Sequence, residues 1–249
     1  MFISQDLLSE KKKGLFLDVD GTLLELKNRP SQVVSSRRLI RLLKGLSDSL
    51  DGALALVSGR SIIDLDRIFT PLQFPLIGVH GLEQRLYSGN TVMMGGNEKL
   101  NTIKTKMKAF AKVYNGIFIE DKGASIALHY RQCPQAKNAA FSLVNELLSK
   151  NIGLHLVSGK MVYEICTHKA DKGVGISKLL KTYPFSERIP IFIGDDQTDE
   201  AGFEFVNSVG GLSIVVGESS NSIAKYRLSS VGEVVSWLED FLKNIRTKR

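Results

Sequence analysis

The sequence predicts an α/β fold in which a mostly parallel sheet forms the core and a smaller α+β domain is inserted into it. Towards both ends of the chain, short apolar runs alternate with helical stretches, which is typical of a doubly wound sheet with right-handed crossovers. In the middle, helices followed by antiparallel hairpins replace this pattern. We therefore expect a core from residues 1–81 and 168–249, and an inserted domain from residues 82–167.

The first part of the core is expected to begin with a buried strand over residues 14–17, an apolar run that leads to a glycine turn. Pro30 and Ser31 then open a helix whose leucines recur at helical spacing, and Asp51-Gly52 ends it. The elements expected next are a strand over 53–57, a helix over 61–69 and a short strand over 75–79.

The inserted domain is marked by a change of pattern near Gly81. A hairpin with a turn at residues 88–90 is expected first, and two rounds of a helix plus an antiparallel hairpin follow. The expected bounds are 83–87 and 91–94 for the first hairpin, 100–114 for a helix, 117–120 and 124–130 for its strands, a helix from Pro134, and 154–157 and 161–165 for the last hairpin.

The core pattern then resumes to the end of the chain. Lys172 opens a helix, and strands are expected over residues 189–193 and 212–216. A final helix carries apolar residues at helical spacing between Val234 and Ile245.

The composition is that of an ordinary globular protein, with 43% hydrophobic and 24% charged residues among 249. No apolar run approaches the roughly 20 residues of a membrane-spanning helix, and the start of the chain does not resemble a signal peptide. The two cysteines, Cys133 and Cys166, fit no metal or disulfide pattern, so we expect a reducing cytoplasm and no membrane. The net charge is +7, and the basic residues are dispersed apart from Lys11–Lys13 and the C-terminal tail. They accompany no nucleic-acid motif, which favours solvated ends and a small anionic ligand over nucleic acid.

Three of the expected strands lead into polar side chains. Asp18 and Asp20 follow the first strand, Ser58 follows the second, and the strand over 189–193 leads to Asp195, Asp196 and Asp199. Because the carboxyl ends of parallel strands lie at one edge of a sheet, these residues are expected to converge. An Asp-x-Asp pair alone would indicate a solvated turn, but acids gathered at one edge repel each other and favour a divalent cation.

Lys172 adds a positive charge at a helix start, where the helix dipole disfavours it by a few tenths to about 1 kcal/mol unless an anion faces it. An exposed lysine whose amine reaches water is the alternative. Together the acids, a hydroxyl and this lysine meet the needs of phosphoryl transfer. One aspartate can attack phosphorus, while its neighbour can protonate the leaving oxygen and then deprotonate water.

The order of these motifs is similar to that of the haloacid-dehalogenase-like phosphatases. Asp18–Thr22, Ser58–Arg60, Lys172 and Gly194–Glu200 resemble the four motifs of that superfamily. Within it, the chain resembles the bacterial trehalose-6-phosphate phosphatase family from about Leu15 to Leu238. Further stretches that match are Gly78–Gly81 and Leu128–Arg131.

The resemblance implies a role for each matching core position. Asp18 would be the nucleophile and a Mg²⁺ ligand, and Asp20 would be the general acid/base with its backbone carbonyl on the metal. Asp195 would be a direct metal ligand, supported by Asp196 and Asp199. Thr22 would help to set the first loop and, with Ser58 and Lys172, would bind the phosphoryl group. The core would be Rossmann-like, and residues 82–167 would be a cap that closes over the sugar.

In the cap, the resemblance assigns sugar binding to five residues: Glu120, Lys122, Arg131, Lys160 and Glu164. Glu120 and Lys122 are two apart on an extended segment and so face one way, and Lys160 and Glu164 do the same if their strand is unbroken. Without the resemblance, cross-strand salt bridges are the alternative interpretation of these residues.

The expected function is therefore the Mg²⁺-dependent hydrolysis of trehalose 6-phosphate to trehalose and phosphate, through an aspartyl-phosphate, in trehalose biosynthesis. Two alternatives stay open: a phosphatase for another sugar phosphate, or a sugar-phosphate-binding regulator without catalysis. We expect a cytoplasmic monomer that binds this small molecule and neither nucleic acid nor a membrane. A dinucleotide-binding role lacks the G-x-G-x-x-G motif after the first strand.

Overall fold

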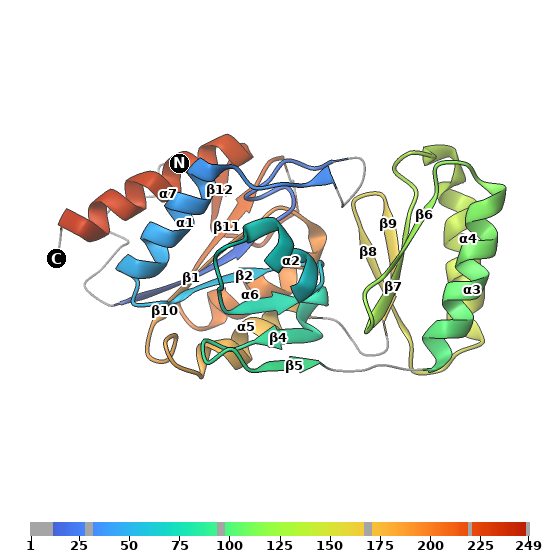
Figure 1. Cartoon of the computed structure of the whole chain (residues 1–249), viewed down its shortest axis with the longest axis horizontal. Helices are drawn as coiled ribbons and strands as arrows, with labels where there is room; N and C mark the ends of the chain where they lie inside the picture. Colours follow the sequence, from blue (N-terminus) through green and yellow to red (C-terminus); the bar gives the residue numbers. More distant parts are fainter. Residues whose placement is uncertain (1–11, 28–31, 94–97, 167–170, 219–220, 248–249) are drawn as a thin grey trace. The chain divides into compact units, whose positions relative to one another are not determined.

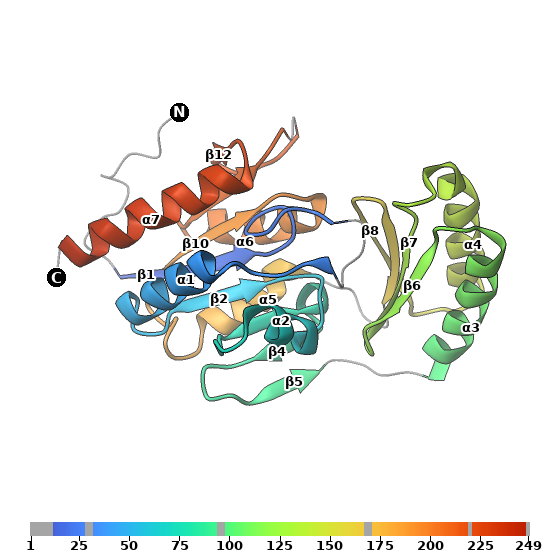
Figure 2. The same ribbon diagram turned by 45° about the horizontal axis from the view of Figure 1, so that its top comes forward.

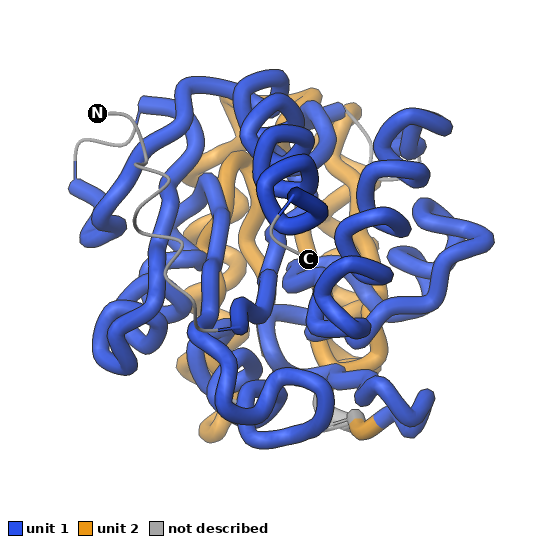
Figure 3. Tube along the Cα trace, turned by 90° about the vertical axis from the view of Figure 1, so that its left-hand side faces the viewer, with its two compact units in different colours: residues 1–91, 171–249 blue, residues 92–170 orange. Residues whose placement is uncertain are grey.

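The computed structural model describes residues 12–27, 32–93, 98–166, 171–218 and 221–247, and the chain divides into two compact units. One unit comprises residues 1–91 and 171–249, and the other comprises residues 92–170 (Figure 3). The second unit is therefore an insertion into the first. Among the described residues, no helix combines the length and the apolar character that crossing a membrane requires.

The first unit is organised around a large sheet with the strand order β12-β11-β10-β1-β2-β3-β4-β5 (Figure 1). Pairing from β12 to β3 is parallel, and β4 is antiparallel to β3. The strands are β1 (Lys13–Asp18), β2 (Leu54–Val57), β3 (Leu76–Gly78), β4 (Glu83–Arg85), β5 (Thr91–Met93), β10 (Ile189–Gly194), β11 (Leu212–Val216) and β12 (Tyr226–Leu228).

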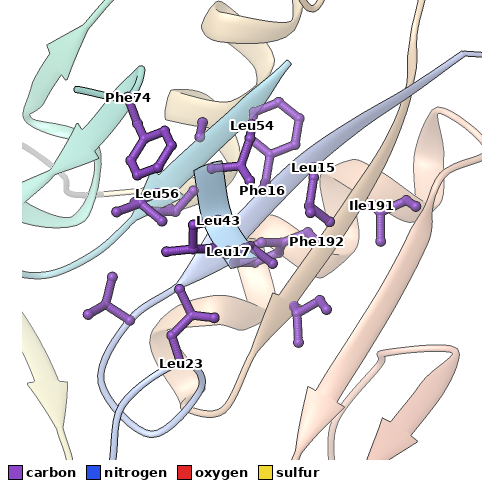
Figure 4. Close-up of a cluster of buried hydrophobic side chains, with 14 of the residues drawn as sticks. Leu15, Phe16, Leu17, Leu23, Leu43, Leu54, Leu56, Phe74, Ile191 and Phe192 are labelled. Carbon is purple, nitrogen blue, oxygen red and sulfur yellow. The ribbon is translucent and has the colours of Figure 1, made fainter. Parts of the chain in front are cut away.

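Two pairs of helices cover this sheet. Helix α1 (Arg37–Ser49) packs beside α7 (Val231–Thr247), and α5 (Lys172–Leu180) packs beside α6 (Glu200–Ser208). Figures 1 and 2 show the two pairs on opposite faces of the sheet, with α2 (Ile62–Phe69) beside β3. Because both faces are covered, the apolar run of β1 is buried in full and forms the centre of the core (Figure 4).

The predicted strands of this unit are confirmed, but the start of the first helix was predicted too early. Residues 33–36 are not helical, and α1 begins at Arg37 because the Ser36 hydroxyl accepts the backbone N–H of Leu39 as an N-cap. The predicted start at Pro30 and Ser31 lies outside the described residues. Sequence reasoning also missed α6 and β12.

The first hairpin belongs to the large sheet and not to the inserted unit. Its strand β4 pairs with β3 in the register Leu76↔Arg85 to Gly78↔Glu83, and the boundary between the units falls inside β5. The structure therefore differs from the predicted start of the insertion at residue 82. A hairpin pattern shows that two strands pair with each other, but it does not show which sheet they extend.

The second unit has its own antiparallel sheet with the strand order β6-β7-β9-β8. Two helices, α3 (Glu98–Val113) and α4 (Lys137–Ser149), cover one face of it (Figure 2), and a separate apolar cluster fills the space between. Alternate residues of β7 and β9 enter this cluster, including Ile126, Leu128 and Ile165. The strands are β6 (Phe118–Asp121), β7 (Ser125–His129), β8 (His155–Gly159) and β9 (Val162–Cys166), which confirms the α+β pattern.

The turn between β8 and β9 corrects one sequence expectation. Gly159 pairs with Val162, so Lys160 and Met161 form the turn, and Met161 has a φ of 65°. The strand is therefore broken between Lys160 and Glu164. Lys160 is exposed in the turn and does not share a strand face with Glu164.

Candidate active site

The register of the large sheet brings the polar strand ends to one edge. Asp18 is level with Val57, so Ser58 lies just beyond the same edge as Asp18. On the other side, Leu17 is level with Ile193, which places Asp195 two residues further along and beside Asp18. The predicted convergence at the carboxyl edge is confirmed for these three positions.

Three carboxylates gather at this edge and are all buried. Oxygen atoms of Asp18, Asp195 and Asp199 lie within 4.8 Å of one another. The Lys172 ammonium donates to Asp18 Oδ1 at 2.8 Å and to Asp199 Oδ1 at 2.6 Å. Lys172 is itself only 3% exposed, so it is not the solvated lysine of the alternative interpretation.

The electrostatics of this cluster follow from its burial. Burial raises the pKa of the Asp18 carboxyl well above its usual value; the Lys172 charge lowers it, and the neighbouring Asp199 and Asp195 charges raise it again. Burial alone would lower the pKa of Lys172, but the charges of Asp18 and Asp199 outweigh burial and raise it. The Lys172 ammonium thus pairs with two of the three buried acids, Asp18 and Asp199.

Asp199 holds the loop that follows β10. Its Oδ2 accepts the backbone N–H groups of Asp195 and Asp196, at 3.0 and 2.9 Å. A side chain at Gly194 would stand 2.4 Å from the Asp199 carboxyl carbon, so only glycine lets Asp199 approach. The Asp196 side chain accepts the backbone N–H of Gln197 and caps its own turn. With both Asp199 oxygens engaged, Asp199 is suited to support the cluster and not to bind a cation directly.

The loop after β1 is shaped around the acids. Gly21 has a φ of 89°, and a side chain there would stand 2.2 Å from Asp195 Oδ2. Thr22 is fully buried, and its Oγ1 has no hydrogen-bond partner among the residues that the structure describes. A buried hydroxyl without a partner is costly unless a ligand satisfies it, so Thr22 marks a place for a polar ligand.

Arg60 is a site residue that sequence reasoning missed. Its Nε and Nη2 donate to the two carboxylate oxygens of Asp20, at 2.6 and 2.7 Å, and its Nη1 donates to Asp64 at 2.7 Å. Its backbone N–H donates to Ser58 Oγ at 3.1 Å, which ties Asp20 and Ser58 to one residue. The only signal was the position of Arg60 in the Ser-Gly-Arg motif. Its partner lies forty residues earlier in the chain.

The donor set fits a hard divalent cation. Buried carboxylate oxygens within 4.8 Å of one another are the ligands that Mg²⁺ prefers. Oδ1 of Asp18 is held by Lys172, while Oδ2 makes no hydrogen bond with any described residue. Asp18 and Asp195 are therefore the side chains suited to bind the cation.

The predicted cap residues form a cluster of their own in the second unit. Glu120 and Glu164 both lie level with Ala127, so they point to the same face of the sheet, away from the helices. Lys122 Nζ donates to Glu164 at 2.7 Å, and both side chains are buried. The cross-strand salt bridge of the alternative interpretation is therefore present. This salt bridge does not exclude sugar binding, because the Lys122 ammonium can donate further hydrogen bonds and the Glu164 carboxylate can accept them.

His129 and Ser125 complete the polar face of the cap sheet. His129 Nε2 and Glu120 Oε2 are hydrogen-bonded at 2.8 Å, and Ser125 donates to Glu164. Burial would raise the pKa of Glu120, but the hydrogen bond with His129 and the charge of Lys122 lower it below its usual value. Glu120 is thus held ionised. Of the other predicted residues, Arg131 donates to the Lys160 carbonyl at 2.9 Å.

Comparison with known proteins identifies the family of this chain. A family model described as trehalose-phosphatase matches residues 16–231. The chain belongs to the trehalose-phosphatase family. A curated relative, the trehalose-6-phosphate phosphatase of Escherichia coli, is 39% identical over 239 residues, which cover 96% of this chain and 90% of the relative. As a member of the trehalose-phosphatase family, the chain is a phosphatase enzyme.

Solved structures confirm the fold. The C-terminal domain of the C. albicans trehalose-6-phosphate phosphatase superposes with a TM-score of 0.83 at 22% identity, covering 96% of this chain and 94% of that one. A haloacid dehalogenase-like hydrolase from Bacteroides thetaiotaomicron gives a TM-score of 0.65 at 17% identity and covers 93% and 100%. This phosphatase therefore has the haloacid dehalogenase-like core with an inserted α+β unit, as the resemblance implied.

Proposed function

We propose that the protein is a Mg²⁺-dependent phosphatase that hydrolyses trehalose 6-phosphate to trehalose and inorganic phosphate. The observation that carries this proposal is the buried cluster of Asp18, Asp195 and Lys172 at the carboxyl edge of the sheet, in a chain of the trehalose-phosphatase family. The E. coli relative bears the name of this activity and matches over nearly the whole chain.

In the first half of the reaction, a carboxylate oxygen of Asp18 forms a bond to phosphorus as the bond from phosphorus to the sugar oxygen breaks. Asp20 gives its proton to that sugar oxygen, which leaves as a neutral hydroxyl. Arg60 occupies one lone pair of each Asp20 oxygen, so this proton is carried on a remaining lone pair. Lys172 and the hydroxyls of Ser58 and Thr22 bind the phosphoryl oxygens. The unpartnered hydroxyl of Thr22 supports this role, because a phosphoryl oxygen would satisfy it.

In the second half, water attacks the aspartyl-phosphate on Asp18. Asp20 now carries a negative charge and takes a proton from this water, and the bond between phosphorus and the Asp18 oxygen breaks. Inorganic phosphate leaves, and Asp18 and Asp20 return to their starting protonation states. Bound Mg²⁺, held by Asp18, Asp195 and the Asp20 carbonyl, would neutralise the phosphate charge that otherwise repels Asp18.

We assign recognition of the sugar to the polar face of the cap sheet. Glu120, Lys122 and Glu164 offer fixed acceptors and donors on this face, and a disaccharide hydroxyl needs one of each. Arg131 and Lys160 lie together at the end of the sheet near the turn. Lys160 is exposed and Arg131 is half-buried, which suits a contact at the edge of the sugar.

A phosphate-release screen tests the function. Purified enzyme is incubated with trehalose 6-phosphate, glucose 6-phosphate, sucrose 6-phosphate and p-nitrophenyl phosphate, each with Mg²⁺ or with EDTA. We expect the highest kcat/KM for trehalose 6-phosphate and a loss of all activity in EDTA. Turnover of other sugar phosphates but not of trehalose 6-phosphate would refute the proposed substrate. Binding of trehalose 6-phosphate without any release of phosphate would indicate a regulator.

Glu120→Ala tests the cap assignment. It removes a charged hydrogen-bonding group from the proposed sugar site and is expected to reduce kcat/KM for trehalose 6-phosphate by about 10–100-fold. The rate with p-nitrophenyl phosphate should change by less than about 3-fold, because that ester has no sugar to bind. Glu146→Ala on α4 is the matched control, since Glu146 is an exposed acid of the same unit. Equal losses on both esters would contradict the assignment.

A further inference from the structure

Asp20, the proposed general acid/base, is held by a single guanidinium group. Both of its carboxylate oxygens accept from Arg60, one from Nε and one from Nη2. This bidentate geometry fixes the plane of the Asp20 carboxylate as well as its distance from the Arg60 guanidinium. The Asp20 side chain is 28% exposed and lies in the loop after β1, and the pair with Arg60 restricts its χ1 rotation.

Arg60 is itself held rigidly. Its side chain is only 7% exposed, and its remaining amine, Nη1, donates to Asp64 in the first turn of α2. Its backbone is fixed as well, because its N–H donates to Ser58 Oγ and its carbonyl accepts the N–H of Val79. Because Arg60 is anchored both at the end of β2 and to α2, these two elements fix the position of the Asp20 carboxylate.

We propose that Arg60 is a positioning residue that places the Asp20 carboxylate for proton transfer, and that Asp64 fixes Arg60 in this role. The inference rests on the proposed function of Asp20 as the acid that protonates the leaving oxygen. A general acid contributes about 10²–10⁴-fold only where its proton lies within hydrogen-bond reach of the leaving group. An Asp20 that turns among several orientations loses most of that contribution.

Two esters separate this role from a purely structural one. The sugar oxygen of trehalose 6-phosphate leaves poorly unless it is protonated, whereas p-nitrophenolate leaves as a stable anion and needs no proton. Release of the alcohol is measured in a single turnover with enzyme in excess. This measurement isolates the first half of the reaction, because the attack of water on the aspartyl-phosphate comes later for both esters.

Arg60→Lys keeps the positive charge but cannot bind both oxygens of Asp20 in the planar geometry. We expect it to slow trehalose release by about 10–100-fold and to change p-nitrophenolate release by less than about 3-fold. Arg85→Lys is the matched control. Arg85 also makes a bidentate pair, with both oxygens of Asp66 at 2.7 and 2.8 Å, and it lies in the same unit away from Asp20. We expect both rates to be unchanged in this control.

Asp64→Asn provides a second variant in case Arg60→Lys does not fold. It leaves the pair of Arg60 with Asp20 intact and removes the charge that fixes Arg60, together with the ion pair that Asp64 makes with Arg67. We expect it to slow trehalose release by about 3–10-fold, with p-nitrophenolate release unchanged.

Equal slowing of both esters, or no slowing of either, in the folded variants would overturn the positioning role. Wild-type enzyme that cleaves p-nitrophenyl phosphate but not trehalose 6-phosphate would refute the proposed function alone. The test of Arg60 would then use whichever alkyl phosphate the enzyme does cleave, since the comparison depends on the leaving group and not on the sugar.

Discussion

Asp18→Asn is expected to reduce phosphate release by about 10⁴-fold or more, because the amide cannot form the bond to phosphorus that starts the reaction. The measurement is steady-state phosphate release from trehalose 6-phosphate with saturating Mg²⁺. The protein should remain folded. Burial raises the pKa of Asp18, so its ionised form is unfavourable in the fold, and the neutral amide removes that cost. Lys172 keeps Asp199 as a partner.

The control for Asp18→Asn is the same substitution on the surface. Asp48 lies on α1, pairs with Lys44 and is 62% exposed, so Asp48→Asn should change neither activity nor stability. We expect the thermal midpoint of Asp18→Asn to stay within about 4 °C of wild type. Retention of more than about a hundredth of the wild-type rate in the folded variant would contradict the assignment of Asp18 as the nucleophile.

Asp195→Asn is expected to abolish the response of the protein to Mg²⁺. In the wild type, a cation that binds only the folded state at 100 times its Kd adds about 2.7 kcal/mol of stability. For a chain of this size, that corresponds to a rise of about 5–10 °C in the thermal midpoint. Differential scanning fluorimetry with and without Mg²⁺ measures this shift independently of catalysis.

The same variant should lose activity by about 10³-fold, because the phosphate charge is no longer neutralised at the site. Asp196→Asn is the matched control from the same loop. Its side chain caps the Gln197 turn, so we expect a smaller loss and a retained Mg²⁺ shift. A full Mg²⁺ shift in Asp195→Asn would show that Asp195 does not bind the cation.

The order of the core strands along the chain was predictable because each buried parallel strand appears in the sequence as a short apolar run. The apolar runs at 14–17 and 189–193 are each followed by polar residues, and β1 and β10 prove to be neighbours with those residues at one edge. Not every element had such a signature. Helix α6 and strand β12 were not predicted. The first helix was predicted to begin near Pro30, whereas α1 begins at Arg37 after an N-cap at Ser36.

In the site, sequence reasoning found the acids and Lys172 but not what holds them. Arg60 was present in a motif, yet its bond to Asp20 joins residues forty positions apart and depends on β2 lying beside β1. Lys160 and Glu164 were expected to share a face only if their strand was unbroken. The turn at Met161 breaks it.

The sequence by itself determined the α/β core, the acids at the strand ends and the resemblance to a phosphatase family, because periodicity and short motifs are local properties. Only the tertiary structure decided that β4 joins the large sheet, that Lys122 pairs with Glu164, and that Arg60 holds Asp20. These contacts form between segments distant in the chain. Their geometry depends on which strands become neighbours and on how closely the side chains are packed.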